Sequence, residues 1–121
     1  NMGIKKYAEI VVNRPIERPF TYSIPGGLRE KVRVGSPVEV SFGKRVVTGY
    51  VVGLSSRCKV KIVKPVIRVL DAAPVMDKEI LQLTRWISRY YYSSWGQAIS
   101  AAVPAVVKRT LKPEGHRKKK E

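Results

Sequence analysis

The pattern of apolar and polar positions over residues 5–70 is typical of β-strands. Five segments rich in valine, isoleucine and tyrosine are bounded by glycine, proline or charged turns, and each predicts a strand. These segments are residues 7–12, 20–24, 38–42, 46–54 and 60–70. Apolar and polar residues alternate strictly over residues 38–42, and Gly43 with Lys44 predicts a tight hairpin turn into the next strand. Pro65 predicts an edge or a bulge in the last strand, because proline has no N–H for a sheet hydrogen bond.

The period of the apolar positions changes after residue 71. Residues that recur every three or four positions predict an amphipathic helix, and they are Ile80, Leu83, Ile87, Tyr90 and Tyr91. Asp77 is a suitable N-cap for this helix. We expect the aromatic members of this stripe, together with Trp86, to pack against the sheet. A second, short helix is predicted over residues 96–103 and is expected to end before Pro104.

Strands that precede helices along the chain predict an α+β fold. Gly49 and Gly53 lie within the fourth predicted strand and indicate that it is curved. We therefore expect a small curved β-sheet or barrel-like subdomain over residues 5–70, followed by a short helical subdomain over residues 71–107. Together these make one domain over residues 1–107, and residues 108–121 are expected to form a basic linker or tail.

The charge of the chain narrows the choice of partner. The 121 residues include 24 Lys and Arg against 9 Asp and Glu, for a formal net charge of +15, while 44% of the residues are hydrophobic and suffice for a core. Residues 29–68 hold ten basic and two acidic residues, whereas residues 69–107 hold three of each. Because the basic residues of the first segment alternate with β-branched residues of predicted strands, folding holds their charges in place. A polyanion is the expected partner.

Few residues of the chain are suited to catalysis. His116 and Cys58 are the only histidine and cysteine, so neither a catalytic triad nor a cysteine metal site can be assembled. The phosphate-binding loop pattern GxxxxGK[ST] is absent. No apolar run approaches the roughly 20 residues that span a bilayer. We therefore expect a cytoplasmic binding domain rather than an enzyme, without a metal or cofactor in this chain and without a membrane segment.

Five motifs of the chain resemble a known family when taken in order. They are residues 18–25 (RPFTYSIP), 35–44 (GSPVEVSFGK), 48–53 (TGYVVG), 64–71 (KPVIRVLD) and 87–91 (ISRYY). Over roughly residues 5–107 the chain resembles the N-terminal DNA-binding domain of the PriA replication-restart helicases of bacteria. The resemblance implies a module that recognises the 3′ end of the nascent leading strand at a stalled fork and positions a helicase for replisome reloading. The full-length parent would be an ATP-dependent 3′ to 5′ DNA helicase, with its ATP and zinc sites in the helicase part.

The resemblance also implies a pocket for the terminal nucleotide. Carried over residue by residue, this 3′-end site falls on Phe20, Thr21, Tyr22, Gly43 and Lys64. The family's aspartate is replaced by Thr21, whose hydroxyl can bond the base or sugar but lacks the charge of a carboxylate. Lys64 is expected to neutralise the adjacent phosphate.

The basic segment supplies candidates for contacts with the DNA backbone. They are Lys44, Arg45, Lys59, Lys61 and Arg68, assigned because this segment carries a net charge of +8.

Partners and alternatives follow from these assignments. The expected ligand is forked DNA or the 3′ end of single-stranded DNA, with single-strand-binding protein and other primosome proteins as further partners, and a monomer is expected. The positive net charge and the predicted strands are also consistent with an RNA-binding or ribosome-associated β-barrel. A third reading is a protein-interaction adaptor, in which residues 71–103 present Tyr92 and Trp95 to a partner.

Overall fold

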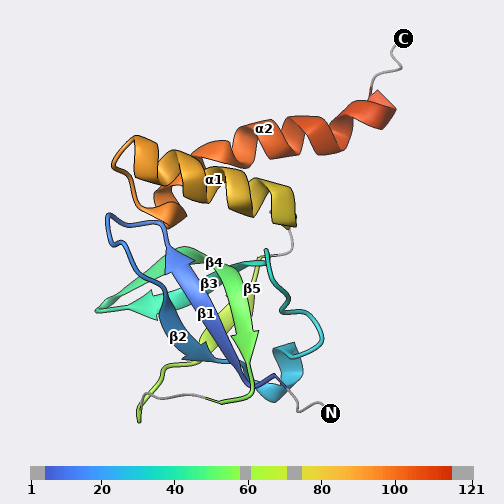
Figure 1. Ribbon diagram of the computed structural model, residues 1–121. Coiled ribbons are helices and arrows are strands. Elements are labelled where there is room, and N and C mark those ends of the chain that lie inside the picture. The colour runs from blue at the N-terminus through green and yellow to red at the C-terminus, as the bar shows by residue number, and fades with distance from the viewer. Residues whose placement is uncertain (1–4, 58–60, 71–74, 116–121) are drawn as a thin grey trace.

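The computed structural model describes residues 5–57, 61–70 and 75–115, with backbone only for residues 108–115. Five strands come first and two helices follow (Figure 1). The strands are β1 Tyr7–Val12, β2 Phe20–Ser23, β3 Pro37–Phe42, β4 Arg45–Ser55 and β5 Val66–Val69, with a 3-10 turn η1 at Gly26–Leu28. The helices are α1 Lys78–Tyr90 and α2 Trp95–Gly115. The predicted α+β class, with the strands before the helices, is confirmed.

The five strands form one antiparallel sheet in the order β2-β1-β4-β3-β5, which curls into a half-barrel (Figure 1). The 11-residue β4 is long enough to pair with both β1 and β3. Phe42 pairs with Arg45, so Gly43 and Lys44 form the two-residue hairpin turn that the sequence predicts. Gly43 has a φ of 63°, a conformation that glycine adopts without strain.

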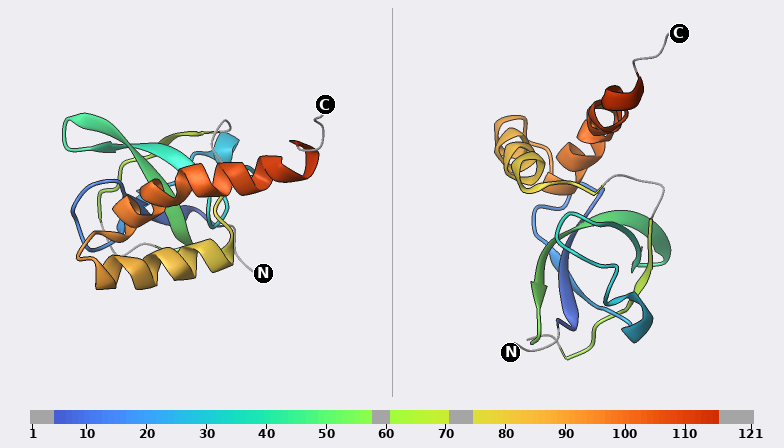
Figure 2. Two further views of the ribbon diagram at one scale, coloured as in Figure 1. Left: turned by 90° about the horizontal axis from the view of Figure 1, so that it is seen from above. Right: turned by 90° about the vertical axis from the view of Figure 1, so that its right-hand side faces the viewer.

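Each face of the sheet contributes to a separate core. Side chains on the concave face pack against one another inside the curled sheet. The buried residues of this first core are Ala8, Ile10, Val12, Tyr22, Ile24, Val32, Val38, Val40, Val47, Val51 and Val66. The other face packs against the helices with residues Val11, Tyr50, Met76, Leu81, Ile99 and Val106. Helices α1 and α2 lie side by side over this second face, so the molecule has a sheet layer and a helix layer (Figure 2). A Cβ on Gly96 would lie 1.9 Å from the carbonyl oxygen of Val12, so only glycine permits this close approach of α2 to β1.

Both helices begin with side-chain caps. The carboxylate of Asp77 accepts a hydrogen bond from the Ile80 N–H at 2.8 Å, which confirms the predicted N-cap of α1. At the start of α2, the Gln97 side chain accepts from the Ser94 N–H at 3.1 Å, and the Ser94 hydroxyl accepts from the Gln97 N–H at 3.1 Å. This reciprocal pair is a capping box, which was not expected from the sequence.

Two predicted element boundaries are wrong. The last strand was expected over residues 60–70, but β5 comprises only Val66–Val69 at the edge of the sheet. Pro65 precedes it and has no N–H for a ladder, which limits the strand on its N-terminal side. The second helix does not end before Pro104 but continues to Gly115. Val103 and Val106, on either side of this proline, pack into the core beneath the helices, and this packing offsets the hydrogen bond that proline removes.

The expected packing of the α1 aromatics is also wrong. Trp86, Tyr90 and Tyr91 are 62%, 66% and 67% exposed rather than packed against the sheet. The buried positions of α1 are instead Leu81, Thr84 and Ser88, about one residue further round the helix. The reason is Trp95 of α2, whose indole N–H donates to the Leu81 carbonyl and the Thr84 hydroxyl, each at 3.2 Å. The small Thr84 leaves room for this large ring, so the helices meet on that face.

Candidate functional site

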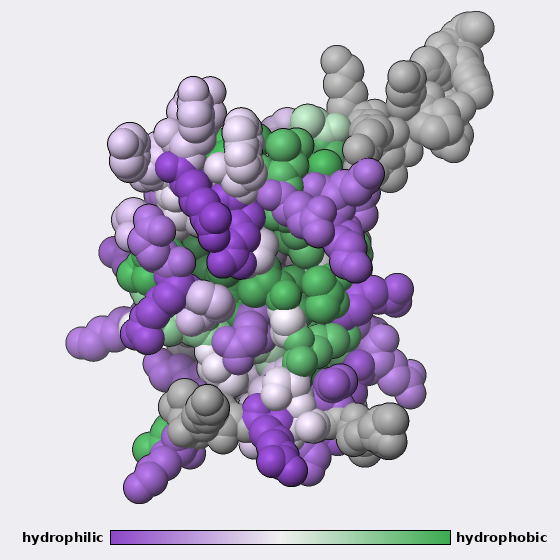
Figure 3. Space-filling model, viewed as in Figure 1, coloured by the Kyte–Doolittle hydropathy of each residue, from purple (hydrophilic) through white to green (hydrophobic). Residues whose placement is uncertain are grey.

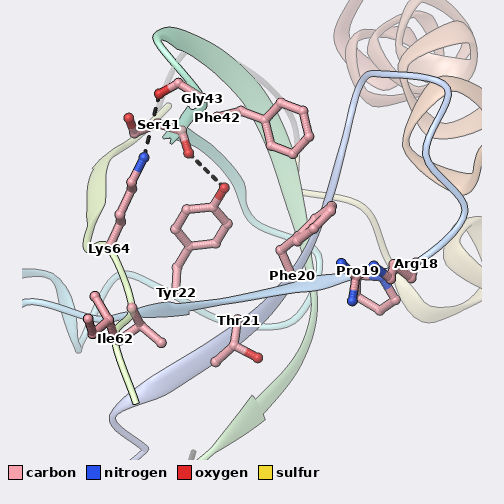
Figure 4. A pocket seen from close by; sticks show the side chains of 11 residues that line it. Arg18, Pro19, Phe20, Thr21, Tyr22, Ser41, Phe42, Gly43, Ile62 and Lys64 are labelled. Atoms are coloured by element: carbon pink, nitrogen blue, oxygen red, sulfur yellow. Dashed lines mark hydrogen bonds between the residues drawn. The ribbon is translucent and has the colours of Figure 1, made fainter. Parts of the chain in front are cut away.

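A cavity of about 360 Å³ opens between β2, the β3–β4 turn and the segment that precedes β5 (Figure 4). Its lining residues are Arg18, Pro19, Phe20, Thr21, Tyr22, Ser41, Phe42, Gly43, Ile62, Val63 and Lys64. These residues come from three separate stretches of the chain. The structure thus brings together all five residues of the predicted 3′-end site, Phe20, Thr21, Tyr22, Gly43 and Lys64.

Aromatic rings form one wall of the cavity. Tyr22 is buried, and its hydroxyl donates to the Ser41 carbonyl at 2.7 Å, which fixes the ring between β2 and β3. Burial raises the pKa of the Tyr22 hydroxyl, so the hydroxyl keeps its proton and this hydrogen bond to a higher pH than an exposed tyrosine would. Phe20 and Phe42 meet edge to face with ring centroids 5.3 Å apart, and the guanidinium of Arg18 lies 4.9 Å from the Phe20 centroid. The result is a rigid apolar surface with a cation at its edge.

The side chain of Thr21 points away from the cavity, unlike those of its neighbours in β2. Successive side chains of a strand point to opposite faces, and the Thr21 side chain points away from Phe20 and Tyr22 (Figure 4). Its hydroxyl donates to the carboxylate of Glu9 on β1 at 2.7 Å. The hydroxyl is therefore engaged outside the cavity, which differs from the expectation that it bonds the nucleotide.

The main chain of Thr21 faces the open edge of the sheet. Along a strand, the N–H and C=O groups of successive residues point to opposite edges, so those of residues two positions apart point to the same edge. The Ile24 N–H donates toward β1, to the Lys6 carbonyl at 2.8 Å, whereas the Ser23 N–H donates away from β1, to the Lys64 carbonyl at 3.0 Å. The backbone groups of Thr21 share the direction of those of Ser23, because the two residues are two positions apart. They point to the outer edge of β2, which is the edge strand beside the cavity.

Lys64 spans the mouth of the cavity. Its ammonium group lies 3.5 Å from the Gly43 carbonyl oxygen, across the cavity from the segment that carries Lys64 (Figure 4). An ammonium group has three donors, so this long contact leaves donors for a phosphate. Ile62, which is 86% exposed, lies at the same rim.

Several lining residues were not expected from the sequence. Ser41, Phe42 and Ile62 join the cavity from the strand end and the segment opposite β2, and Arg18 lies at its edge. The RPF tripeptide that contains Arg18 was already part of the first motif, so this cation had a signal in the sequence. Nothing local marks Ile62, because its role depends on where its segment lies.

The predicted backbone-contact residues differ in how free their charges are. Lys44 and Arg45 are exposed at the β3–β4 turn, next to Gly43, and Lys61 is exposed next to Ile62. Arg68 instead pairs with Glu39 across β3 and β5, with Nε–Oε1 and Nη2–Oε2 distances of 2.8 and 3.3 Å. This hydrogen-bonded carboxylate raises the pKa of the Arg68 guanidinium and locally balances its charge. Lys59 lies outside the described residues.

The described part of the chain shows neither a metal site nor a membrane helix. Within it, no three histidine, cysteine, aspartate or glutamate residues are grouped so that they could hold a metal ion. None of its helices combines the length and the apolar character needed to cross a bilayer.

Comparisons with known proteins point to one family. The family model of the PriA 3′ DNA-binding domain matches residues 9–104. The replication restart protein PriA of Bacillus subtilis (strain 168) is 34% identical over 113 residues, which are 89% of this chain and 14% of that protein. The PriA proteins of Chlamydia pneumoniae and Treponema pallidum are 31% and 30% identical and match 91% and 82% of the chain. The chain covers 15% and 16% of those two proteins, so it spans about one seventh of the length of these relatives.

Proposed function

The chain belongs to the family of PriA 3′ DNA-binding domains, and from this premise we propose that it binds DNA by taking the terminal nucleotide of a 3′ end into the cavity between Phe20, Tyr22 and Lys64. At a stalled replication fork this end belongs to the nascent leading strand. Recognising it positions the remainder of a longer protein, an ATP-dependent helicase, for reloading of the replisome. Single-strand-binding protein and other primosome proteins are the further partners in this proposal. The proposed location is the bacterial cytoplasm.

One observation carries the proposal. Five residues that the family resemblance assigns to a terminal-nucleotide site, spread over residues 20–64, line one cavity of about 360 Å³. Ligand cavities range from about 300 to 1,000 Å³, so this one is suited to a single nucleotide rather than to a longer segment. A cavity of this size favours a chain end, because an internal nucleotide carries a continuing strand on both sides.

Each wall of the cavity has a chemical counterpart in a nucleotide. The rings of Phe20 and Tyr22 offer an apolar wall for the base. The main-chain N–H and C=O of Thr21 offer a donor and an acceptor at the edge of β2. Lys64 offers a cation to the phosphate that links the terminal nucleotide to the strand.

End selection in this proposal rests on shape and backbone hydrogen bonds. None of the described residues that line the cavity is acidic, and the carboxylate of Glu9 is bonded to Thr21 on the opposite face of β2. A terminal phosphate is therefore not repelled by a carboxylate in the cavity and has to be excluded by its size. We expect DNA with a free 3′ end to bind much more tightly than DNA without one. The difference in affinity between a 3′-hydroxyl and a 3′-phosphate should be smaller.

Fluorescence anisotropy at about 0.15 M salt tests the proposal. Linear and circular single strands of equal length and sequence separate end binding from strand binding, and forked DNA with an accessible 3′-hydroxyl, a 3′-phosphate or a recessed end ranks the termini. We expect the linear strand and the accessible 3′-hydroxyl fork to bind about tenfold more tightly than the circle and the recessed fork, which corresponds to about 1.4 kcal/mol. The variant Phe20→Ala should abolish the difference. Arg68→Gln, a change on the same sheet outside the cavity, should preserve it.

Equal affinity of the wild-type chain for all of these DNAs would overturn the 3′-end proposal. In that case the basic residues act as a general clamp for polyanions. Tighter binding of RNA strands without regard to their ends would instead favour the RNA-binding class.

A further inference from the structure

Three aromatic rings lie exposed at the C-terminal end of α1, two from the helix itself and one from its C-cap residue. Trp86, Tyr90 and Tyr91 are 62%, 66% and 67% exposed and form what we call the aromatic surface. Pale side chains of intermediate hydropathy gather over this end of α1 in the space-filling view (Figure 3). Large aromatic side chains normally bury most of their area, so a group of three in solvent marks a surface that binds something.

The rings of the aromatic surface are held in an ordered arrangement. Trp86 and Tyr90 stack with centroids 5.6 Å apart and planes 10° from parallel, and Tyr91 meets Tyr90 edge on at 5.2 Å and 81°. Trp86 and Tyr90 are four residues apart on one helix, so the helix itself fixes the stack. A planar ligand that stacks on the outer face of Trp86 would extend a stack of two rings and would order little of the protein.

The charges around the aromatic surface favour an anionic partner. Arg85 and Arg89 are exposed on the same half of α1, whereas the acidic residues Asp77 and Glu79 lie at its other end. The guanidinium of Arg85 lies 4.7 Å from the centroid of Trp95, which holds this cation against the start of α2. Planar stacking partners joined by phosphates are the ligand that such a combination of exposed rings and arginines recognises.

The position of the aromatic surface relates it to the cavity. The C-terminal end of α1 and the turn between β3 and β4 lie toward the same side of the molecule in both Figure 1 and Figure 2. The loop between β1 and β2 rises from Arg18 at the cavity edge toward the helices (Figure 4). Arg14 lies on this same loop, so the route from the cavity to α1 carries Arg14 and Arg18 against one acidic residue, Glu17.

We propose that the aromatic surface is a second nucleic-acid contact, on which bases of the single strand stack upstream of the nucleotide held in the cavity. This inference rests on the proposed function, because it takes the 3′ end to be bound in the cavity. It adds a site on the helix layer, which none of the residues predicted for DNA binding occupies. The stack accepts any base, so this contact contributes affinity without sequence preference.

Strand length separates the two sites. A 3′-hydroxyl oligonucleotide of about three nucleotides can place its terminal nucleotide in the cavity but is too short to reach the helix layer, whereas one of about 15 nucleotides can contact both. The double variant Trp86→Ala, Tyr90→Ala should bind the short strand like the wild type and the long strand about ten times more weakly. Leu83→Ala is the matched control, since it removes an exposed apolar side chain from the same helix without removing a ring, and it should leave both affinities unchanged.

Tryptophan fluorescence gives a second measurement that needs no loss of a ring. We expect the long strand, but not the short one, to quench the wild-type emission. Trp86→Phe should lose this quenching and keep most of the affinity, since Trp95 is partly buried against α1.

Unchanged affinity of the double variant for the long strand, or quenching that persists in Trp86→Phe, would overturn the inference. If the wild-type chain bound short strands with equal affinity whether or not their 3′ end is accessible, this result would instead contradict the proposed function. The two failures are therefore distinguishable.

Discussion

The hydroxyl of Thr21 donates a hydrogen bond to the carboxylate of Glu9, its direct cross-strand partner, at 2.7 Å. The pair lies on the face of β2 opposite Phe20 and Tyr22. On this face the Thr21 hydroxyl is therefore already engaged by a carboxylate of the protein itself. The resemblance implies an aspartate at the position of Thr21. An aspartate here would stand directly opposite Glu9, and the two strands would carry like charges at the same position of the ladder.

We expect Thr21→Asp to destabilise the chain by about 0.5 to 1 kcal/mol at pH 8, because like charges directly opposite in a sheet repel. Adding Glu9→Gln should restore the stability, since the amide can donate to the new carboxylate. Urea unfolding of the two single variants and the double variant measures the coupling. A Thr21→Asp chain that is as stable as the wild type would show that the strands relieve the repulsion in another way.

Charge-removing substitutions should affect DNA binding according to whether the cation is already paired. Replacing Lys44 and Arg45 together by glutamine should lower the slope of log affinity against log salt by about 0.7 for each phosphate that is no longer neutralised. Arg68→Gln should leave this slope nearly unchanged, because Glu39 already balances the Arg68 charge. Salt titrations of binding to one single strand provide the comparison. An equal reduction of the slope in Arg68→Gln would mean that DNA displaces Glu39 from the pair.

Alkaline pH should destabilise the fold through two buried tyrosines. Burial raises the pKa of Tyr22 and of Tyr50 above the usual 10.0, and the Ser100 side chain lowers that of Tyr50 in part. Above about pH 10 the unfolded chain releases these protons while the folded chain retains them, so stability is full below that pH and falls as pH rises beyond it.

Tyr22→Phe tests this pH dependence. The variant should lose about 1 kcal/mol at pH 7, because the Ser41 carbonyl loses its donor. It should then lose less stability than the wild type between pH 9 and about pH 11. Urea unfolding across this range measures both effects, and a decline as steep as that of the wild type would exclude Tyr22 as a source.

Tyr92 occupies a backbone conformation that suits glycine. It follows α1 with a φ of 55°, and the next residue, Ser93, donates its N–H to the Ser88 carbonyl at 3.1 Å, as in a Schellman motif. Its side chain is 95% exposed, so it adds little packing. Tyr92→Gly should therefore stabilise the chain by about 1 kcal/mol. Thermal unfolding checks this, with Tyr92→Ala as the control, since alanine bears the same strain and should bring no gain.

The local features of the fold could be predicted from the sequence. The alternation over residues 38–42, the Gly43-Lys44 turn and the Asp77 cap depend on contacts within a few residues, and the structure has each of them. The five motifs of the resemblance also placed the family, because their order and spacing reflect the whole domain rather than one contact.

The orientation of α1 could not be predicted in this way. Its apolar stripe through Leu83, Tyr90 and Tyr91 has the period of a helix, which shows that a helix forms but not which face is covered. The covered face depends on Trp95, which comes from the next helix and fits against Thr84. A large ring that needs both room and a hydrogen-bond acceptor outweighs the apolar stripe of the neighbouring helix. Pro104 stays within α2 for a related reason, because the valines around it are buried.

By itself the sequence determined the first four strands, the hairpin, the start of the first helix and the family, since each is encoded by neighbouring residues or by the order of motifs. Only the tertiary structure decided which way each side chain of these elements faces. Curling of the sheet brings β2, the β3–β4 turn and Lys64 around one cavity, the pairing of β1 with β2 sets Glu9 opposite the Thr21 hydroxyl, and the contact between the helices leaves Trp86 and Tyr90 in solvent. These outcomes depend on packing between segments far apart in the chain, where the best fit of volumes and hydrogen bonds prevails over the local pattern.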